Sequence, residues 1–369
     1  MIITRKIEIF CCEDDKELRK QYYERLYEHI NCAVKVANMT VSHLFMLDNT
    51  TPYLSDEDRE KLTYLGCGGQ KATKRNAPYV AASEQFKGKM SMNMIANLQN
   101  VICKEYADDR KKGMWNRSLR SYKSNMPIPF QPKEFRDLRF VEYTDGEGQA
   151  RTGCFFSLMN IPFQMRFGRD RSNNRVIVER AIEGDYKMCT SSIQADGRKL
   201  FLLFCVDIPQ QEVKLEEGKR MMAYLDVEVP IVCFVEGKRK KTEIGSKEEF
   251  LHRRLQIQEA VRRCQINNKY ATGGQGRRRK CQAIERYHDK EKNYVGTKLH
   301  TYSRLLVDLA VKHRCSEIVL MKQTSREEKA KDEHAKGEPF VLRNWSYFGL
   351  KDKINYKAGR VGIKMTVEK

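Results

Sequence analysis

The sequence predicts an α+β protein of several domains, in which a helical segment interrupts a β-barrel and a mixed α/β domain follows. Apolar residues recur at helical spacing through much of residues 13–126, and β-type alternation dominates from residue 127 to about residue 216. After Lys219, strand patterns alternate with helical patterns. The 369 residues, 40% of them hydrophobic, suffice for several cores at roughly 150 residues per domain.

The N-terminal part begins with a short predicted strand, Ile2–Phe10, in which apolar and charged residues alternate. A long helix is expected at about Asp15–Leu47, because its apolar residues are spaced three and four apart. A second helical stretch is expected at about Ala82–Lys112, after a turn-rich region. We therefore assign residues 1–12 to the first strand of the barrel and residues 13–126 to a helical domain.

The barrel itself is predicted at residues 127–218, where short strand patterns follow one another. Strands are expected at Phe155–Leu158, Pro162–Phe167 and Val176–Glu179. A hairpin is expected to join Met188–Gln194 to Lys199–Asp207, because the Asp-Gly pair between them is a strong turn signal.

The last domain, residues 219–369, has a predicted order of three antiparallel strands, helix, strand, helix and strand, which is typical of RNase H-like nucleases. The strands are expected at Met221–Val229, Ile231–Glu236, Lys240–Ile244, Glu317–Lys322 and Ile363–Glu368, with a helix from about Trp345. Such nucleases hold two divalent metal ions with carboxylates at strand ends. Where those acids are expected, this sequence has Tyr224 and Met321. It therefore predicts a domain that holds nucleic acid without cutting it.

The net charge of +20, from 69 Lys and Arg against 49 Asp and Glu, indicates a polyanionic partner. Residues 250–300 hold 13 basic and 4 acidic residues in two predicted helices, Leu251–Gln265 and Arg277–Leu309, around a glycine-rich turn. The predicted nucleic-acid-binding residues here are Arg253, Arg254, Arg262, Arg263, Arg277, Arg278, Arg279 and Lys280. The alternative is a solvated basic face without a dedicated partner.

A second basic cluster lies in the helical domain and is interleaved with aromatic residues. Aromatic faces stack on bases, and cations bind the phosphate backbone. The predicted binding residues here are Arg110, Lys111, Lys112, Trp115, Arg117, Arg120, Tyr122 and Lys123. Trp115 has an alternative role as a packing residue at a helix end.

Membrane insertion and zinc binding are not expected. No uncharged run reaches the ~18 residues of a membrane-spanning helix, the longest apolar run being Leu200–Val206. The N-terminus does not resemble a signal peptide. The twelve cysteines include no C-x-x-C pair, so we expect reduced thiols in a cytoplasmic protein and no zinc site.

Two runs of sequence resemble the RuvC domain of a known protein group. They are YSRLLVDLAVKHRCSEIVLMK at 302–322 and RNWSYFGLKDKINYKAGRVGIKM at 343–365. On these runs and on its order of domains, the chain resembles transposon-encoded TnpB proteins and the miniature type V-F CRISPR effectors. This resemblance covers essentially the whole chain. It implies a helical recognition domain inserted in an oligonucleotide-binding-like wedge barrel, followed by an RNase H-like RuvC domain.

The departures from that group concern the catalytic acids. Its first catalytic strand has a pattern like G-x-D-x-G followed by a proline, and alignment on Pro230 places Tyr224 at the Asp position and Asp226 at the second Gly. Met321 stands at the position of the second acid. In the relatives the third acid and a zinc ribbon follow the last strand, whereas this sequence stops at Lys369. The resemblance therefore implies a nuclease-dead relative without a catalytic metal.

The function implied is RNA-guided DNA binding. The expected partners are a guide RNA and double-stranded DNA with a short flanking motif, and a stable R-loop would regulate transcription by blocking RNA polymerase or recruiting it through a sigma-type factor. A homodimer is a further expectation. One alternative is an RNA-guided endonuclease whose site is rearranged or completed by a partner, using Asp226 or Glu228 from a shifted register. Another is a plain structured-RNA-binding protein.

Overall fold

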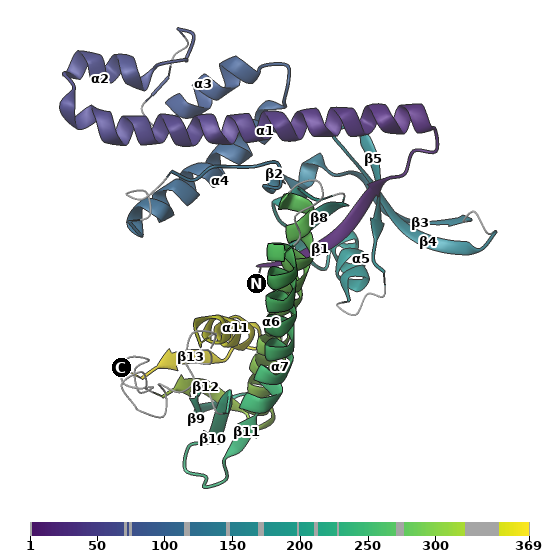
Figure 1. Cartoon of the computed structure of the whole chain (residues 1–369), viewed down its shortest axis with the longest axis vertical. Coiled ribbons are helices and arrows are strands. Elements are labelled where there is room, and N and C mark those ends of the chain that lie inside the picture. Colours follow the sequence, from purple (N-terminus) through teal and green to yellow (C-terminus); the bar gives the residue numbers. More distant parts are fainter. Residues whose placement is uncertain are drawn as a thin grey trace. The chain divides into compact units, whose positions relative to one another are not determined.

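The computed structural model describes residues 2–69, 72–73, 76–113, 119–144, 148–168, 173–197, 199–209, 213–226, 229–270, 277–321 and 347–368, without the side chains of 270, 277–280 and 347. They form two compact units, Met1–Pro209 and Gln210–Lys369 (Figure 1). Each unit has a hydrophobic core of its own. The division falls shortly before Lys219, where the sequence predicted the last domain to begin.

The helices of the N-terminal unit pack around one long helix. They are α1 (Lys16–Thr50), the 3₁₀ turn η1 (Thr51–Tyr53), α2 (Asp56–Thr63), α3 (Ala77–Phe86) and α4 (Met92–Lys111). Figure 1 shows α3 and α4 beside α1, which contacts both. The prediction of one helix at about Ala82–Lys112 is wrong, because Gly88 has a φ of 78° that ends α3 and Ser91 caps α4 by accepting a hydrogen bond from the Met94 N–H.

Helix α1 begins after Asp15, whose carboxylate accepts hydrogen bonds from the N–H groups of Glu17 and Leu18. By length and composition alone, α1 with η1 is apolar enough to span a membrane, since an 18-residue window of it contains no more than two charges. The expectation that the chain does not enter a membrane was based on uncharged runs, a criterion that this helix does not meet. The apolar side chains of α1, from Leu26 to Val41, are buried against the core that includes α3 and α4, which is also how the core helix of a globular unit behaves.

The strands of the N-terminal unit form one curled antiparallel sheet of eight strands. Its order is β2-β7-β8-β1-β5-β4-β3, with β6 paired to β8. The strands are β1 (Ile2–Cys11), β2 (Ile128–Phe130), β3 (Arg136–Thr144), β4 (Ala150–Leu158), β5 (Ile161–Arg166), β6 (Lys187–Met188), β7 (Ser191–Asp196) and β8 (Lys199–Asp207). The predicted hairpin is confirmed: Asp196 pairs with Lys199 around Gly197.

One predicted strand of this region is wrong. The segment Val176–Glu179 lies in a helix, α5 (Asn174–Glu183), which buries Ile177, Val178 and Ala181. Those three positions repeat at helical spacing. A run as short as four residues does not distinguish the helical repeat from the alternation of a strand.

Aromatic side chains form the centre of the sheet's buried face. The Phe135 ring meets the rings of Phe130, Phe156 and Phe204 edge-on, with centroids 5.0, 5.4 and 5.9 Å apart. Phe130 and Phe204 are fully buried. Such edge-to-face contacts add to the stabilisation from apolar burial.

The C-terminal unit has a five-stranded sheet with the order β11-β10-β9-β12-β13. Its strands are β9 (Glu216–Tyr224), β10 (Ile231–Val235), β11 (Thr242–Ile244), β12 (Cys315–Leu320) and β13 (Lys364–Val367). Its helices are α6 (Lys247–Tyr270), α7 (Arg277–Lys312) and α11 (Tyr347–Arg360). Strand β12 is parallel to both β9 and β13, while β10 is antiparallel to β9 and to β11. Among the described residues of this unit, the elements follow the order expected from the sequence.

We predict that Phe204→Ala lowers the free energy of unfolding of the N-terminal unit by about 3–5 kcal/mol, because it leaves a cavity against Phe135. The matched control is Phe201→Ala on the other face of the same strand, where the ring is half-buried under the Lys6 ammonium. Urea unfolding followed by far-UV circular dichroism compares the two. Equal losses would contradict the position assigned to Phe204.

Candidate nucleic-acid interface

Tyr224 and Met321 lie side by side at one edge of the C-terminal sheet. Strand β9 ends at Tyr224 and β12 ends at Leu320, and Leu320 pairs in parallel with Ala223. The Met321 N–H donates to the Ala223 carbonyl over 2.9 Å. The carboxyl ends of two neighbouring parallel strands therefore present a phenol and a thioether.

The surroundings of this edge are partly apolar. The Tyr224 ring stacks on Phe234, with centroids 6.2 Å apart and an interplanar angle of 27°. Mg²⁺ prefers hard oxygen ligands, carboxylates above all, and the soft thioether of Met321 is a poor substitute. Neither of these two side chains supplies the charged oxygen that a two-metal nuclease site requires.

Two acidic residues lie near the same edge. Asp226 follows Tyr224 by two positions, and the Glu368 N–H donates to the Leu320 carbonyl over 2.9 Å. The predicted continuation of β9 to Val229 is wrong, because β9 ends at Tyr224, which pairs with Val232 of β10, and neither Leu225, Asp226 nor Val229 is part of a strand. Glu228 lies outside the described residues. Within the described part of the chain, no three His, Cys, Asp or Glu side chains gather as a metal site would require.

A pair of packed helices, α6 and α7, carries the larger basic cluster. Glu249 holds the two together: its carboxylate pairs with Lys298 and accepts a hydrogen bond from the Tyr302 hydroxyl over 3.2 Å. The Tyr294 hydroxyl donates to the Glu249 carbonyl over 2.7 Å. The hydrogen bond from Lys298 lowers the pKa of the Glu249 carboxyl, and burial together with that carboxylate raises the pKa of Tyr302.

Arg254, one of the predicted nucleic-acid-binding residues, is buried and paired within the protein. Only 5% of this residue is exposed, and its guanidinium donates to Glu291 at 2.8 and 2.9 Å while lying 5.4 Å from the centre of the Phe250 ring. Arg253 next to it is exposed. Consecutive helical residues point about 100° apart, so one of two adjacent arginines faces α7 and the other faces solvent.

The other predicted cations of this region remain candidates. Arg262 and Arg263 are exposed, and the 3.9 Å contact of Arg263 with Glu259 is too solvated to neutralise it. Arg277–Lys280 begin α7, and their side chains lie outside the described residues. Sequence reasoning missed further exposed cations of α7 that its helical pattern could have identified, among them Arg286, Lys290 and Lys292.

In the N-terminal unit, two predicted binding residues are engaged in ion pairs. Arg110 contacts Asp48 over 2.9 Å. Arg120 makes a bidentate contact with Asp109, at 2.7 and 2.8 Å, which lowers the pKa of that carboxyl. These carboxylates offset part of the positive charge on which the prediction was based.

The remaining residues of this cluster have different environments. Lys111, Lys112 and Lys123 are exposed, whereas Trp115 and Arg117 lie outside the described residues. The Tyr122 hydroxyl donates to Glu105 over 2.7 Å, and its pKa is raised by burial and by that carboxylate.

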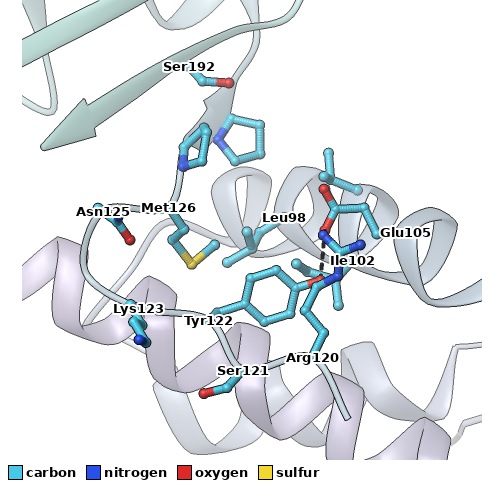
Figure 2. A pocket seen from close by; sticks show the side chains of 13 residues that line it. Leu98, Ile102, Glu105, Arg120, Ser121, Tyr122, Lys123, Asn125, Met126 and Ser192 are labelled. Carbon is cyan, nitrogen blue, oxygen red and sulfur yellow. Dashed lines mark hydrogen bonds and ion pairs between the residues drawn. The ribbon is translucent and has the colours of Figure 1, made fainter. Parts of the chain in front are cut away.

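Arg120, Tyr122 and Lys123 meet at a pocket of about 320 Å³ between α4 and the segment that leads into β2 (Figure 2). Figure 2 shows Tyr122 and Arg120 directed toward Glu105 of α4. The lining is Leu98, Val101, Ile102, Glu105, Arg120, Ser121, Tyr122, Lys123, Asn125, Met126, Pro127, Pro129 and Ser192. Apolar walls with a basic rim suit a stacked base beside its phosphate.

Two curated proteins are similar in sequence to this chain. The CRISPR-associated endodeoxyribonuclease Cas12f1 of Sulfoacidibacillus thermotolerans is 33% identical over 202 residues, which cover 53% of this chain and 45% of that protein. Cas12f1 of Syntrophomonas palmitatica is 30% identical over 205 residues, covering 52% and 39%. The chain thus matches less than half the length of these relatives. No protein-family profile matches it.

A solved structure has the same fold. A Cas12f1–sgRNA–target DNA complex contains a chain that matches with a TM-score of 0.69 at 13% identity, covering 100% of this chain and 89% of that one. The α+β architecture with a curled antiparallel sheet is therefore shared with that structure.

We predict that Arg254→Met lowers the free energy of unfolding of the C-terminal unit by about 3 kcal/mol or more, because it leaves Glu291 buried without its partner. The matched control, Arg253→Met, is expected to change stability by less than about 0.5 kcal/mol. The double variant Arg254→Met with Glu291→Met should recover much of the loss in urea unfolding. Equal stability of the two single variants would place Arg254 at the surface.

Proposed function

We propose that this relative of the Cas12f1 proteins is an RNA-guided DNA-binding protein that does not cleave its target. One observation carries the proposal: Tyr224 and Met321 occupy the neighbouring carboxyl ends of β9 and β12. In a two-metal nuclease these positions hold charged oxygen ligands, which clamp the attacking and leaving oxygens through the metal ions. Without them this edge of the sheet lacks the charged ligands that would assemble that clamp.

The nucleic acid is bound mainly through its phosphates. The exposed cations of α6 and α7, among them Arg262 and Arg263, are suited to a phosphodiester backbone. In this proposal the bound polynucleotides are a guide RNA and the DNA that pairs with it. Base pairing supplies the sequence specificity, and protein contacts supply shape and charge.

The N-terminal unit supplies recognition of a short duplex motif beside the target. The exposed Lys123 and the apolar pocket walls at Pro127 and Pro129 suit a phosphate with an adjacent base or sugar. Protein contacts to such a motif nucleate strand separation in RNA-guided systems.

The proposed role is regulation of transcription. An R-loop that is formed and not cut persists on the DNA, where it blocks RNA polymerase in the cytoplasm. Recruitment of polymerase through a sigma-type factor is the other regulatory outcome of the same complex, and a homodimer on one guide is part of the proposal.

A second candidate function is guided cleavage with a rearranged active site. The presence of Asp226 and Glu368 near the sheet edge favours it, as does the endodeoxyribonuclease activity in the names of the relatives. Because positions 224 and 321 hold no carboxylates, a Mg²⁺ ion bound by Asp226 and Glu368 would be coordinated mostly by waters and phosphate oxygens.

We predict that the purified protein, with co-purified RNA, binds a guide-matched duplex in Mg²⁺ and leaves both strands intact. Gel shift and denaturing electrophoresis of end-labelled DNA measure binding and cleavage on one sample. Cleavage that disappears in Asp226→Asn would establish the second function instead.

We also predict that Arg262→Gln with Arg263→Gln reduces the slope of log affinity against log salt by about 1.8 for duplex DNA, since each neutralised phosphate contributes about 0.9. The matched control is Lys238→Gln with Lys240→Gln, which removes the same charge from the exposed turn after β10. Fluorescence anisotropy at several salt concentrations gives the slopes. An unchanged slope in the arginine variant would remove these residues from the interface.

A further inference from the structure

A third basic surface, separate from the two clusters predicted from the sequence, lies along the packed helices α7 and α11. The two helices contact each other within the C-terminal unit, where Figure 1 shows α11 beside α7. His300 and Arg304 are four residues apart on the exposed side of α7, and α11 presents Lys353, Lys357 and Arg360 beside them. We call these five residues the α7–α11 basic face.

Lys357 joins the two helices. Its ammonium donates to the His300 carbonyl and, over 2.9 Å, to the hydroxyl of the buried Ser303. An ammonium has three protons to donate, so these two bonds leave one for another acceptor. Burial and the nearby charges of Arg304 and Lys353 lower the pKa of Lys357 to about 8.

The positive charge of this face is poorly neutralised by the protein. Four of its side chains are Lys or Arg, and the carboxylate of Asp308 opposes their effect at Lys357. Asp308 lies 3.4 Å from Arg304, with both side chains well exposed, so this pair is strongly screened by solvent. The pKa of His300 is lowered by burial and by Lys353 and Lys357, so its imidazole adds no charge at neutral pH.

Cations that are held close together repel one another, and a bound anion reduces this repulsion. Phosphate brings negative charge and strong acceptor oxygens, and it restores the charged form of a lysine whose pKa has been lowered by cationic neighbours. Residues four apart on a helix are spaced by about 6 Å along its axis. The face therefore offers a line of cations suited to successive phosphates along one strand.

We infer that the α7–α11 basic face binds the phosphodiester backbone of a polynucleotide strand, with Lys353, Lys357 and Arg360 as its contacts. The inference adds a contact surface to the proposed function and rests on it for the identity of the strand. None of these residues was identified from the sequence, because on α11 they alternate with apolar residues that face the core.

The first test removes charge from this face and leaves Lys357 unchanged. We expect Lys353→Gln with Arg360→Gln, in the full-length protein, to lower the salt-dependence slope for a short oligouridylate by about 1.4, at about 0.7 per phosphate on single strands. Lys238→Gln with Lys240→Gln is again the matched control and should leave the slope unchanged. Equal slopes in the two variants would overturn the inference.

The second test uses the titration of Lys357. Below pH 8 its ammonium is charged in the free protein, and above pH 8 it is neutral unless a bound phosphate keeps it protonated. Binding then takes up a proton, and affinity for the oligonucleotide should fall by up to about tenfold from pH 7 to pH 9. Lys357 also faces the charged groups of Arg304, Asp308, Lys353 and Arg360. The variant Lys357→Met is therefore needed to measure how much of the pH dependence of binding is due to Lys357 itself.

The expected result is a smaller pH dependence in Lys357→Met, together with loss of proton uptake measured by calorimetry in two buffers of different ionisation enthalpy. Circular dichroism tests whether this variant is folded. If it is not, the salt-dependence slope of Lys353→Gln with Arg360→Gln decides whether the inference holds. Full proton uptake in folded Lys357→Met would remove Lys357 from the contact.

The probes separate this inference from the proposed function. Oligouridylate carries no guide sequence, so its binding to this face does not depend on guided recognition of DNA. Oligothymidylate of the same length shows whether the face prefers RNA or accepts either backbone. If the protein binds oligouridylate through this face but does not bind duplex DNA in a guide-dependent way, the proposed function is refuted and the inference about this face is not.

Discussion

The parallel pairing of β9 with β12 is the constraint on which the functional interpretation depends. The two strands are far apart in the sequence, and the pairing of Leu320 with Ala223 brings their carboxyl ends to one edge of the sheet. Polar residues at such an edge can act together on one ligand, whereas the same residues elsewhere would remain isolated. The identity of the side chains at this edge, Tyr224 and Met321, therefore bears directly on metal chemistry.

Charge is used in three different ways in this basic chain. The guanidinium of Arg254 is buried and paired with Glu291, where it joins two helices. Arg262 and Arg263 are solvated and available to a polyanion. Lys357 is intermediate: it joins α7 to α11, yet neighbouring cations lower its pKa and favour an external anion. Net charge predicts the class of partner, but only burial separates these three uses.

The sequence allowed the order of elements in the C-terminal unit to be predicted because its strands are short apolar runs separated by long helical patterns. The same reasoning failed where periodicity is short or interrupted. At Val176–Glu179, four residues fitted a strand and belong to a helix, and near Gly88 a continuous helical pattern concealed the end of one helix and the start of another. In both places the pattern of apolar residues was too short or too continuous to show where the helix begins or ends.

The sequence by itself determined which residues are charged, where most of the helices and strands lie, and that an aromatic residue and a methionine stand at positions 224 and 321. Only the tertiary structure decided which of these residues become neighbours. It placed Tyr224 beside Met321, turned Arg254 inward and Arg253 outward, and brought Lys357 of α11 onto Ser303 of α7. The physical reason is that secondary structure follows from local periodicity, whereas proximity and burial follow from the packing of apolar faces distant in sequence.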